Sequence, residues 1–512
     1  MKIQVIGHAG LLIEVSGVRI LTDPWWEGPA YHGQWYPYPI PAADRSLFEK
    51  IDYLYISHGH HDHLHESTLK LVPKTAVVLI PYLLEPGLGE YLKFLGFDRV
   101  VECPYGERIA LPRKASATIY NNEDDSFLVL EGEGEILLNG NDALHADTAA
   151  VIEHFCRLIK RHHPRIDYMF MGYGGAAWFP NCVDFTDAAG FYDPAYREFL
   201  FTRNFIRIAD LLRPSYAFPF AASFALLEKD NRWVNRMKFS VPDPSFCLEI
   251  PGVQSYYLMP GDSVERSQVR RGKERRPSPD EAEREIGIIY RQAIDGLEAP
   301  PPPPPEWIDS FARALGEHAG RKSAYLIPAG KQIDLRIDVA ELPQRSFLLS
   351  AQRGRAQVTP VDPDFAASII LKSRREILEA CLTEPFGYEA ITIGCGARIY
   401  LRKGDFGLVG KIIGLISQKA NPETLLGNYR LALRRQTRRT LRYLYHSRHW
   451  LPYVLKERLG LVKSNDVYSL DPARWNPERY EDVLREYRAA IEKWRARETG
   501  NTVEARSYGL AV

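Results

Sequence analysis

The sequence has no apolar run approaching the ~20 residues that a membrane-spanning helix needs. Its six cysteines are scattered without a C-x-x-C pair, which argues against a disulfide framework, an iron–sulfur motif or a zinc ribbon. The formal net charge is zero, so no overall field draws the chain toward nucleic acid or membranes. The amino terminus shows no basic segment followed by an apolar core and a cleavage site. We therefore expect a cytoplasmic protein with no membrane span and no nucleic-acid partner.

The composition is typical of a globular protein, with 45% hydrophobic and 25% charged residues. A length of 512 residues allows two or three domains, each with its own core. Alternating patterns predict three short strands over residues 2–25, and helical spacing predicts helices over 148–163 and 194–212. Later in the chain, residues 367–382 predict a helix and residues 390–393 a strand.

One stretch concentrates groups that bind metal ions. The pattern H-x-H-x-D-H is formed by His58, His60, Asp62 and His63. It follows residues 51–55, which alternate β-branched and aromatic side chains as a strand does. On a tight turn, alternating side chains converge as two ligand sets, one for each of two neighbouring metal ions. Neutral imidazoles suit zinc and iron, and the carboxylate adds hard-oxygen character.

The motif, together with Gly7–Gly10 and Leu21–Trp25, resembles the metallo-β-lactamase superfamily. Residues 174–176 and 213–221 extend the likeness to the metallo-β-lactamase part of CMP-N-acetylneuraminate hydroxylases, over about residues 3–235. The resemblance implies an α/β fold, namely the αββα sandwich of two sheets with helices outside. It also implies a site for two metal ions.

The resemblance places further ligands on later loops. Asp142, in the loop after a predicted hairpin, matches the family's bridging aspartate, and we expect Asp62 and Asp142 to serve in catalysis. The histidine expected before that hairpin is missing; Asn121 lies nearest to its position, and Glu123 is a substitute. The last histidine of hydrolytic members is also absent, since residues 219–222 form an apolar turn. Such a site approaches the two-His-one-carboxylate set that holds non-haem iron.

Other residues are expected beside the metal ions or in the pocket. Asp23 ends the third predicted strand, where a carboxylate accepts the second ring N–H of a ligand histidine; capping a turn is the alternative. Trp25 begins an aromatic loop that either walls a pocket or packs as a surface lid. Gly174 and Gly175 permit close backbone approach to a ligand, or form a plain turn. His8 belongs to a segment that carries the resemblance.

The proline run at residues 300–305 is the main predicted boundary, because polyproline II is stiff and cannot join a sheet. The expected division is a metallo-β-lactamase-like metal-binding domain over 1–265, a charged and proline-rich linker over 266–306, an α+β module resembling a sterol-carrier-protein-type module over 307–405, and a helical, arginine-rich region over 406–512.

These features support three interpretations. The first is an iron-dependent oxygenase or hydroxylase acting on a polar or anionic small molecule. The resembled hydroxylases draw electrons from a Rieske module, and this sequence has no Cys–His pairs at Rieske spacing, so oxidation would need a separate electron-donor protein or a second iron. The second is a hydrolase of a phosphodiester, lactone or amide that uses a metal-bound hydroxide. The third is a non-catalytic, metal-stabilised binding subunit. We expect two metal ions, iron ahead of zinc, and a homo-oligomer is compatible with the sequence.

Overall fold

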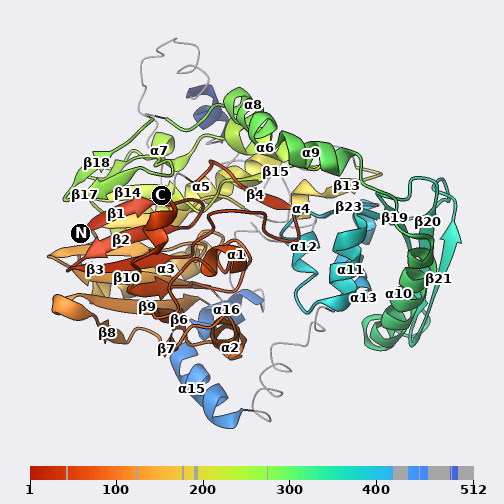
Figure 1. The fold of residues 1–512 in the computed structure, drawn as a ribbon, viewed down its shortest axis with the longest axis horizontal. Helices are drawn as coiled ribbons and strands as arrows, with labels where there is room; N and C mark the ends of the chain where they lie inside the picture. The colour runs from red at the N-terminus through yellow and green to blue at the C-terminus, as the bar shows by residue number, and fades with distance from the viewer. Residues whose placement is uncertain are drawn as a thin grey trace.

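A pair of facing sheets forms the larger part of the computed structural model (Figure 1). The described residues are 1–41, 44–122, 125–175, 178–188, 194–273, 275–418, 436–448, 450–458, 485 and 487–493. The first sheet has the order β18 (Gln268–Arg270), β17 (Ser263–Glu265), β1 (Lys2–Val5), β2 (Leu11–Val15), β3 (Val18–Thr22), β5 (Tyr53–Tyr55), β6 (Val77–Pro81) and β7 (Arg99–Cys103).

The second sheet faces the first. Its order is β16 (Gln254–Ser255), β14 (Tyr216–Phe220), β12 (Tyr168–Gly172), β11 (Glu135–Asn139), β10 (Asp125–Gly132), β9 (Ser116–Asn122) and β8 (Arg108–Ala110). A short ribbon of β4 (Trp35–Pro37) and β15 (Phe224–Leu226) lies beside the sandwich.

Side chains of the strands alternate between a core shared by the two sheets and an outer layer. In β2, Leu11 and Ile13 join Leu128 and Phe170 in the shared core, whereas Leu12 joins the cluster beneath α1 (Glu66–Leu69) and α2 (Gly87–Phe94). This period of two is what a strand imposes. The helices α3 (Ala149–His162) and α5 (Pro194–Leu212) cover the outer face of the second sheet. The αββα sandwich predicted from the sequence is confirmed.

A third sheet lies at the far end of the molecule from the sandwich (Figure 1). Its order is β13 (Val183–Phe185), β23 (Ala397–Leu401), β22 (Ile370–Ser373), β19 (Gln332–Val339), β20 (Ser346–Gln352) and β21 (Arg355–Val361). It packs with α10 (Pro305–Leu326), α11 (Arg375–Thr383) and α13 (Val409–Ile416) around one apolar core. We call residues 305–418 the third-sheet module.

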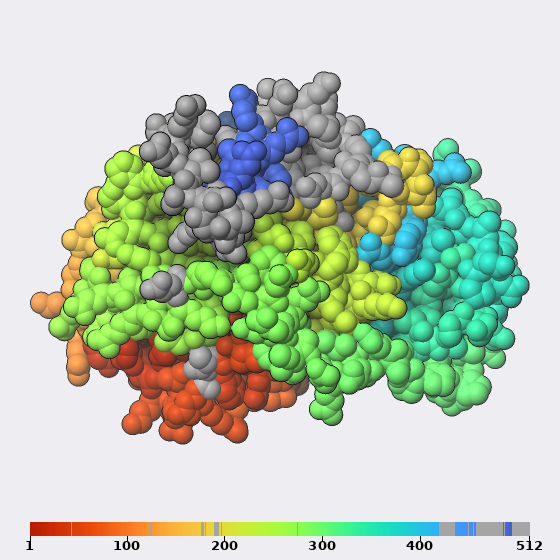
Figure 2. Space-filling model, turned by 90° about the horizontal axis from the view of Figure 1, so that it is seen from above, coloured from red at the N-terminus to blue at the C-terminus, as the bar shows by residue number. Residues whose placement is uncertain are grey.

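The strand β13 comes from the sandwich part of the chain and yet belongs to the third sheet. It runs parallel to β23, with Val183 opposite Ile399 and Phe185 opposite Leu401. It follows α4 (Trp178–Asn181), and the backbone nitrogen of Ile399 donates to the carbonyl oxygen of Cys182 at 2.8 Å. A strand from the sandwich part of the chain therefore forms one edge of the third sheet. In the space-filling view they form one continuous surface (Figure 2).

Residues 266–306, expected as a linker, are folded against the sandwich. They contribute β18 to the first sheet, followed by α8 (Pro279–Ile289) and α9 (Arg291–Glu298). Ile286 and Ile294 from these helices are buried with Phe239 of α6 (Trp233–Ser240). In sequence, the short helix α7 (Pro244–Cys247) follows α6 and precedes β16. Residues 300–304 lie outside any helix or strand, Pro304 is extended as expected for a stiff spacer, and Pro305 begins α10.

Two predictions of secondary structure in the third-sheet module were wrong in part. The helix expected over residues 367–382 begins only at Arg375, because Ile370–Ser373 alternates exposed and buried side chains and forms β22. Residues 390–393, expected as a strand for their β-branched side chains, lie mainly in α12 (Glu389–Thr392). Tertiary packing overrides β propensity here, because this segment closes the module's core rather than pairing with a strand.

The carboxyl-terminal region returns to the sandwich. It includes α15 (Thr437–Ser447) and α16 (Leu451–Arg458). Tyr443 of α15 and Trp450, just before α16, are buried in the cluster that covers the second sheet. Arg439, one of the clustered arginines, forms a two-pronged ion pair with Glu102 at 2.8 and 3.2 Å. No helix in the described part of the chain is long and apolar enough to cross a membrane.

Candidate metal centre

The H-x-H-x-D-H motif forms a tight loop between β5 and α1. The backbone nitrogens of His63 and Leu64 both donate to the carbonyl oxygen of His60, at 3.0 and 2.7 Å. The loop ends where the His65 side chain accepts a hydrogen bond from the Thr68 backbone nitrogen and caps α1. Because β5 is interior to its sheet, the loop sits at the carboxyl end of a fixed strand. The position predicted from the sequence is therefore the observed one.

One group of donor atoms consists of His58, His60 and Asp125. Their donor atoms lie within 4.8 Å of one another. The nearest pair is His58 Nε2 and His60 Nδ1, at 2.8 Å, and Asp125 Oδ1 is 3.7 Å from His58 Nδ1. Burial, followed by the neighbouring imidazoles of His63 and His60, lowers the pKa of His58 well below its usual value. His58 therefore stays neutral and keeps a lone pair for a metal ion.

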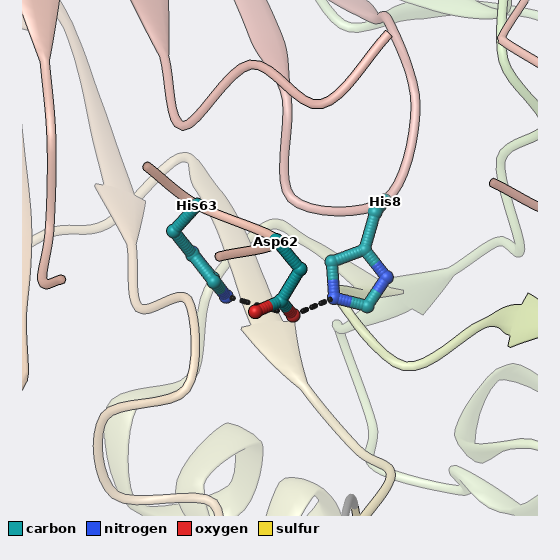
Figure 3. A group of neighbouring side chains, drawn as sticks. All are labelled: His8, Asp62 and His63. Carbon is teal, nitrogen blue, oxygen red and sulfur yellow. Dashed lines mark ion pairs between the residues drawn. The ribbon is translucent and has the colours of Figure 1, made fainter. Parts of the chain in front are cut away.

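A second group consists of His8, Asp62 and His63, shown in Figure 3. Asp62 Oδ2 lies between the two rings, 3.0 Å from His8 Nε2 and 3.6 Å from His63 Nε2. His8 comes from the loop between β1 and β2, and the other two come from the motif loop. Burial opposes the ionised form of Asp62, but the positive charge of His63 and the hydrogen bond from His8 outweigh it, so the pKa of Asp62 is well below its usual range.

Asp142 lies between the two groups. Its Oδ2 is 3.4 Å from His63 Nε2, and His58, His63 and Asp142 form a third set of donors within 4.8 Å of one another. Burial acts to raise the pKa of Asp142, but the positive charge of His63 and the close approach of its ring nitrogen lower the pKa overall. The carboxylate thus stays ionised where a ligand shared by two ions would stand.

Asp23 holds His63 from the other side of the ring. Its Oδ2 is 3.3 Å from His63 Nδ1, and its Oδ1 accepts a 2.8 Å hydrogen bond from the Ser57 backbone nitrogen. The carboxylate is fully buried, and this burial raises its pKa although His63 acts to lower it. Contact with Nδ1 leaves Nε2 directed toward Asp62 and Asp142. This arrangement is the one expected when a second carboxylate orients a ligand histidine.

The donor set fits a cation better than it fits hydrogen bonding alone. His63 Nε2 is buried and makes no hydrogen bond within the described part of the chain, although two carboxylate oxygens lie 3.4 and 3.6 Å away. Ligands about 2.0–2.2 Å from a tetrahedral ion stand about 3.3–3.6 Å apart. Three carboxylates, the buried Asp23 and Asp62 and the partly buried Asp142, surround this ring. Burial acts to lower the pKa of His63, but Asp142 and Asp62 raise it well above its usual value, so a proton on the ring balances part of their charge and a cation at Nε2 would take that proton's place. His8, His58, His60, His63, Asp62, Asp125 and Asp142 are the residues that would hold metal ions.

Asn121 and Glu123 were expected as the third ligand, and only Asn121 is among the described residues. Asn121 is buried on β9, and its amide nitrogen donates to the Tyr82 carbonyl oxygen at 3.1 Å. Its Oδ1 is buried and makes no hydrogen bond among the described residues, so it stays a candidate. Glu123 lies outside the described residues. Asp125, two residues later, was not predicted as a ligand, because no spacing rule distinguishes it from its acidic neighbours.

His8 was expected beside the site, and the structure places it among the donors. Hydrolytic relatives carry their last histidine on the turn after β14, where this chain has an apolar segment. The carbonyl oxygen of His8 accepts from the Ala221 backbone nitrogen at 3.0 Å, and its Nδ1 lies 2.9 Å from the Ser223 carbonyl oxygen. An imidazole from another loop thus comes to that turn. The sequence carried no local signal for this substitution.

Trp25 and the two glycines pack around the site rather than line an opening. Trp25 is fully buried, its Nε1 donates to the Gly28 carbonyl oxygen at 2.9 Å, and its ring lies edge-on to His8 at 5.5 Å. A Cβ on Gly174 would lie 2.7 Å from the Cβ of Ala222, and one on Gly175 would overlap the Phe201 ring. The close approach that these glycines allow is therefore to neighbouring protein.

His145, close to Asp142 in sequence, supports that residue's loop. Its Nδ1 contacts the Asp142 carbonyl oxygen, and its ring stacks on Phe201 at 5.1 Å. Asn204 donates to the His145 carbonyl oxygen at 2.9 Å. Burial lowers the pKa of His145, although Asp142 acts to raise it. The ring is neutral and structural in this arrangement.

Comparison with known proteins agrees with the fold and the motif. Residues 2–139 match the family model of the beta-lactamase superfamily domain. The amino-terminal part of this chain has the metallo-β-lactamase fold. The family resemblance drawn from the sequence is thereby confirmed, and the histidine and aspartate groups described above fit metal binding in such a domain.

Several relatives resemble parts of the chain that carries this metallo-β-lactamase domain. A Mycobacterium tuberculosis protein named as a Rieske 2Fe-2S iron-sulfur protein is 34% identical over 200 residues, covering 36% of each chain. A Streptomyces venezuelae 3-hydroxylase of 4-amino-L-phenylalanyl groups on a peptidyl-carrier protein is 36% identical over 128 residues, 22% of this chain and 23% of that one. The chain thus spans about a third or less of the length of these relatives.

Two solved structures also match. A diiron beta-hydroxylase from Streptomyces venezuelae has a TM-score of 0.31 and 22% identity, covering 43% of this chain and 44% of that chain. An isothiocyanate hydrolase from Delia radicum gut bacteria has a TM-score of 0.34 and 14% identity, covering 52% of this chain and 98% of that chain.

Proposed function

We propose that this protein is a dinuclear metalloenzyme that uses dioxygen to hydroxylate a polar or anionic small molecule, with iron ahead of zinc as its metal. The observation that carries the proposal is Asp125. It stands with His58 and His60 as the third donor of one group, four residues after Asn121, the position nearest to the missing histidine. A group of two histidines and one carboxylate is the donor set that suits non-haem iron.

The wider site supports the same choice. Asp62, Asp125 and Asp142 supply hard oxygen donors beside four imidazoles, a more anionic set than the histidine-rich zinc sites of hydrolases. Iron bound there would supply the redox chemistry that dioxygen requires. The protein's own contribution is to keep His58 neutral, to orient His63 through Asp23, and to keep Asp142 ionised.

The relatives support hydroxylation but leave the electron supply to a partner. One relative is named a 3-hydroxylase, and a 73-residue segment of the chain is 38% identical to a cytidine monophosphate-N-acetylneuraminic acid hydroxylase of Asterias rubens, covering 14% of this chain and 11% of that one. Within the 512 residues there are no Cys–His pairs at Rieske spacing. A separate electron-donor protein is therefore part of the proposal.

The deciding experiment measures metal content and oxygen consumption together. Protein purified without added metal should carry iron near two equivalents, and the reduced protein should consume O₂ when small polar acids and an electron source are supplied. Asp125→His should shift the metal preference toward zinc, because it removes the oxygen donor and adds an imidazole. Asp147→His, outside the donor groups, is the matched control. Zinc-dependent cleavage of phosphodiesters or lactones without O₂ uptake would assign the site to a hydrolase.

A further inference from the structure

A buried tyrosine holds the metal-loop aspartate from outside the donor groups. The hydroxyl of Tyr31 donates a 2.6 Å hydrogen bond to Asp62 Oδ1. Both residues are buried, at 1% and 3% relative exposure, so water does not compete for this bond. Hydrogen bonds to a carboxylate are about twice as strong as those between neutral groups.

This hydrogen bond divides the two oxygens of Asp62 between separate tasks. Oδ1 is occupied by Tyr31, while Oδ2 faces His8 and His63 at 3.0 and 3.6 Å. The carboxylate is thereby fixed with one defined oxygen toward the donors. Without Tyr31, the group could rotate about its Cβ–Cγ bond and present either oxygen, and an ion would lose a preorganised ligand.

Tyr31 reaches Asp62 from a constrained backbone position. Its φ is 51°, in the left-handed region that non-glycine residues rarely adopt. Its ring is stacked on His61 at 5.2 Å and lies edge-on to Trp35 at 4.8 Å. Such a conformation persists only where the surroundings fix it.

The third-sheet module supplies part of those surroundings. A Cβ on Gly394 would lie 2.9 Å from the Cβ of Tyr31, so the turn after α12 touches the tyrosine directly. A Cβ on Gly396 would lie 3.1 Å from the Gln34 side chain. The Gln34 amide donates to Glu228 at 3.1 Å. Figure 1 shows α12 on the side of the module that faces α1 and β4.

A salt bridge fastens the same loop from the module side. Arg374, the residue before α11, bonds Glu228 Oε1 through its Nε at 2.6 Å. Its Nη2 donates a 3.4 Å hydrogen bond to the His32 carbonyl oxygen. The side chain of Arg374 is only 11% exposed, so water competes little for these bonds. The loop that carries Tyr31 is therefore held by residues far away in the chain.

We propose that Tyr31 is a positioning residue for the metal ligand Asp62, and that the Gly394–Gly396 turn of the third-sheet module holds Tyr31 in place. The inference rests on the metal-binding part of the proposed function and is independent of whether the reaction is oxidative or hydrolytic. The third-sheet module is then a structural part of the metal centre rather than a separate accessory unit.

The test compares Tyr31→Phe with Tyr38→Phe. Tyr38 is equally buried on the same stretch of chain and donates to a carboxylate, Glu285 Oε2, at 2.9 Å, but it is not in contact with the donor groups. Both variants lose one hydroxyl and one hydrogen bond, so a purely structural cost should be similar. Metal affinity is measured with Co²⁺ and Zn²⁺ against a chromophoric chelator, and the Co²⁺ visible spectrum reports ligand geometry.

We expect Tyr31→Phe to weaken metal binding by about 10-fold or more, the usual effect of losing an outer-shell partner, and to alter the Co²⁺ spectrum. Tyr38→Phe should change neither. Equal affinities and spectra in the two variants would overturn the inference while leaving the metal site intact. A wild-type protein that binds no metal would overturn the proposed function as well, so the two failures are distinguishable.

The role of the module is tested with Gly394→Ala. The added methyl must displace Tyr31 or the Ala390 carbonyl, so metal affinity should fall although the substitution is outside the sandwich. Gly410→Ala in α13 is the control, since nothing lies within 4 Å of a Cβ there. If Gly394→Ala folds and binds metal as tightly as Gly410→Ala does, the module does not hold the site.

Discussion

His8 and Asp62 meet at 3.0 Å, with Nε2 of the histidine directed at Oδ2 of the aspartate. They come from different loops of the first sheet, one after β1 and one after β5. The backbone of His8 is also tied to the turn after β14 in the second sheet through Ala221. The hydrogen bond between His8 and Ala221 therefore joins the two sheets beside the metal centre.

His8→Ala should therefore remove metal from one of the two donor groups and leave the other. We expect the protein to lose about one equivalent of metal while the fold persists, because His58, His60 and Asp125 are untouched. Elemental analysis of the purified variant gives the stoichiometry. His162→Ala, an exposed histidine at the end of α3, is the control and should retain the full content.

Asp142→Asn should lower the metal content more than loss of His8 or Asp125 does, since each of these belongs to one donor group only. An amide carries no charge, and the donors around His63 and His58 would lose the carboxylate they share. Metal stoichiometry should fall well below that of Asp147→Asn, which changes the charge nearby without touching a donor group. Equal and small effects of the two substitutions would assign Asp142 to ordinary loop structure.

Much of this site was predictable, and the parts that were not have a physical reason. His58, His60, Asp62 and His63 lie within six residues, so their convergence depends only on a local turn. Asp23 was expected as a partner because it ends a strand beside that turn, and it lies 3.3 Å from His63. Local spacing therefore carried the first ligands and one supporting residue.

Contacts between distant segments were not predictable in the same way. Tyr31 meets Asp62 across 31 residues of sequence in a loop that the third-sheet module contacts, and Asp125 is one of three acidic residues in a row. The third-sheet module shows the same limit: residues 390–393, three of them β-branched, fold mainly into α12 because they cover a core assembled from several segments. The αββα sandwich was predictable because family resemblance and strand periodicity pointed to it together.

Phe170→Ala should destabilise the sandwich strongly. The ring is fully buried on β12 and stacks on Phe218 at 4.6 Å in the core between the sheets. Removing it costs about 3–5 kcal/mol of unfolding free energy, including the cavity left behind. Denaturant titration gives the loss. Phe94→Ala, at a residue 82% exposed, should change the midpoint only slightly.

Stability should fall in mild acid because of His163. Burial lowers the pKa of His163, although Glu131 acts to raise it, so the folded protein favours the neutral ring. Glu131 Oε1 lies 2.7 Å from Nδ1 and the Tyr120 hydroxyl 3.0 Å from Nε2. The unfolded chain, with a histidine pKa of about 6.5, binds more protons just below that pH, so the contribution is present above pH 6.5 and decreases below it.

The measurement is the denaturation midpoint of wild type and His163→Gln between pH 8 and pH 5, in steps of about half a unit across the histidine range. We expect the wild-type midpoint to fall more steeply than the variant's as the pH decreases through about 6.5. His162→Gln, next in sequence but exposed, should follow the wild type. A wild-type curve that runs parallel to that of His163→Gln would contradict the assignment.

The ion pair between Arg439 and Glu102 should hold the carboxyl-terminal helix α15 on the sandwich. Both side chains are partly buried, and Arg439 also donates through Nε to the Leu83 and Leu84 carbonyl oxygens at 3.1 Å. A double-mutant cycle with Arg439→Ala and Glu102→Ala should give a coupling of about 1 kcal/mol. Amide exchange in Thr437–Ser447 should become faster in either variant. Unchanged exchange would show that Tyr443 and Trp450 suffice to dock the helix.

The placement of β13 in the third sheet has a consequence for how the protein is made. During synthesis, Val183–Phe185 leaves the ribosome long before its partner strand Ala397–Leu401 exists. Until that partner is translated, the three residues have an unsatisfied backbone edge, which invites pairing with other chains. A fragment cut at the proline run would have the same open edge permanently. We therefore expect the two halves of this protein to complete their folding together, late in translation, and neither to be expressed in good yield without the other.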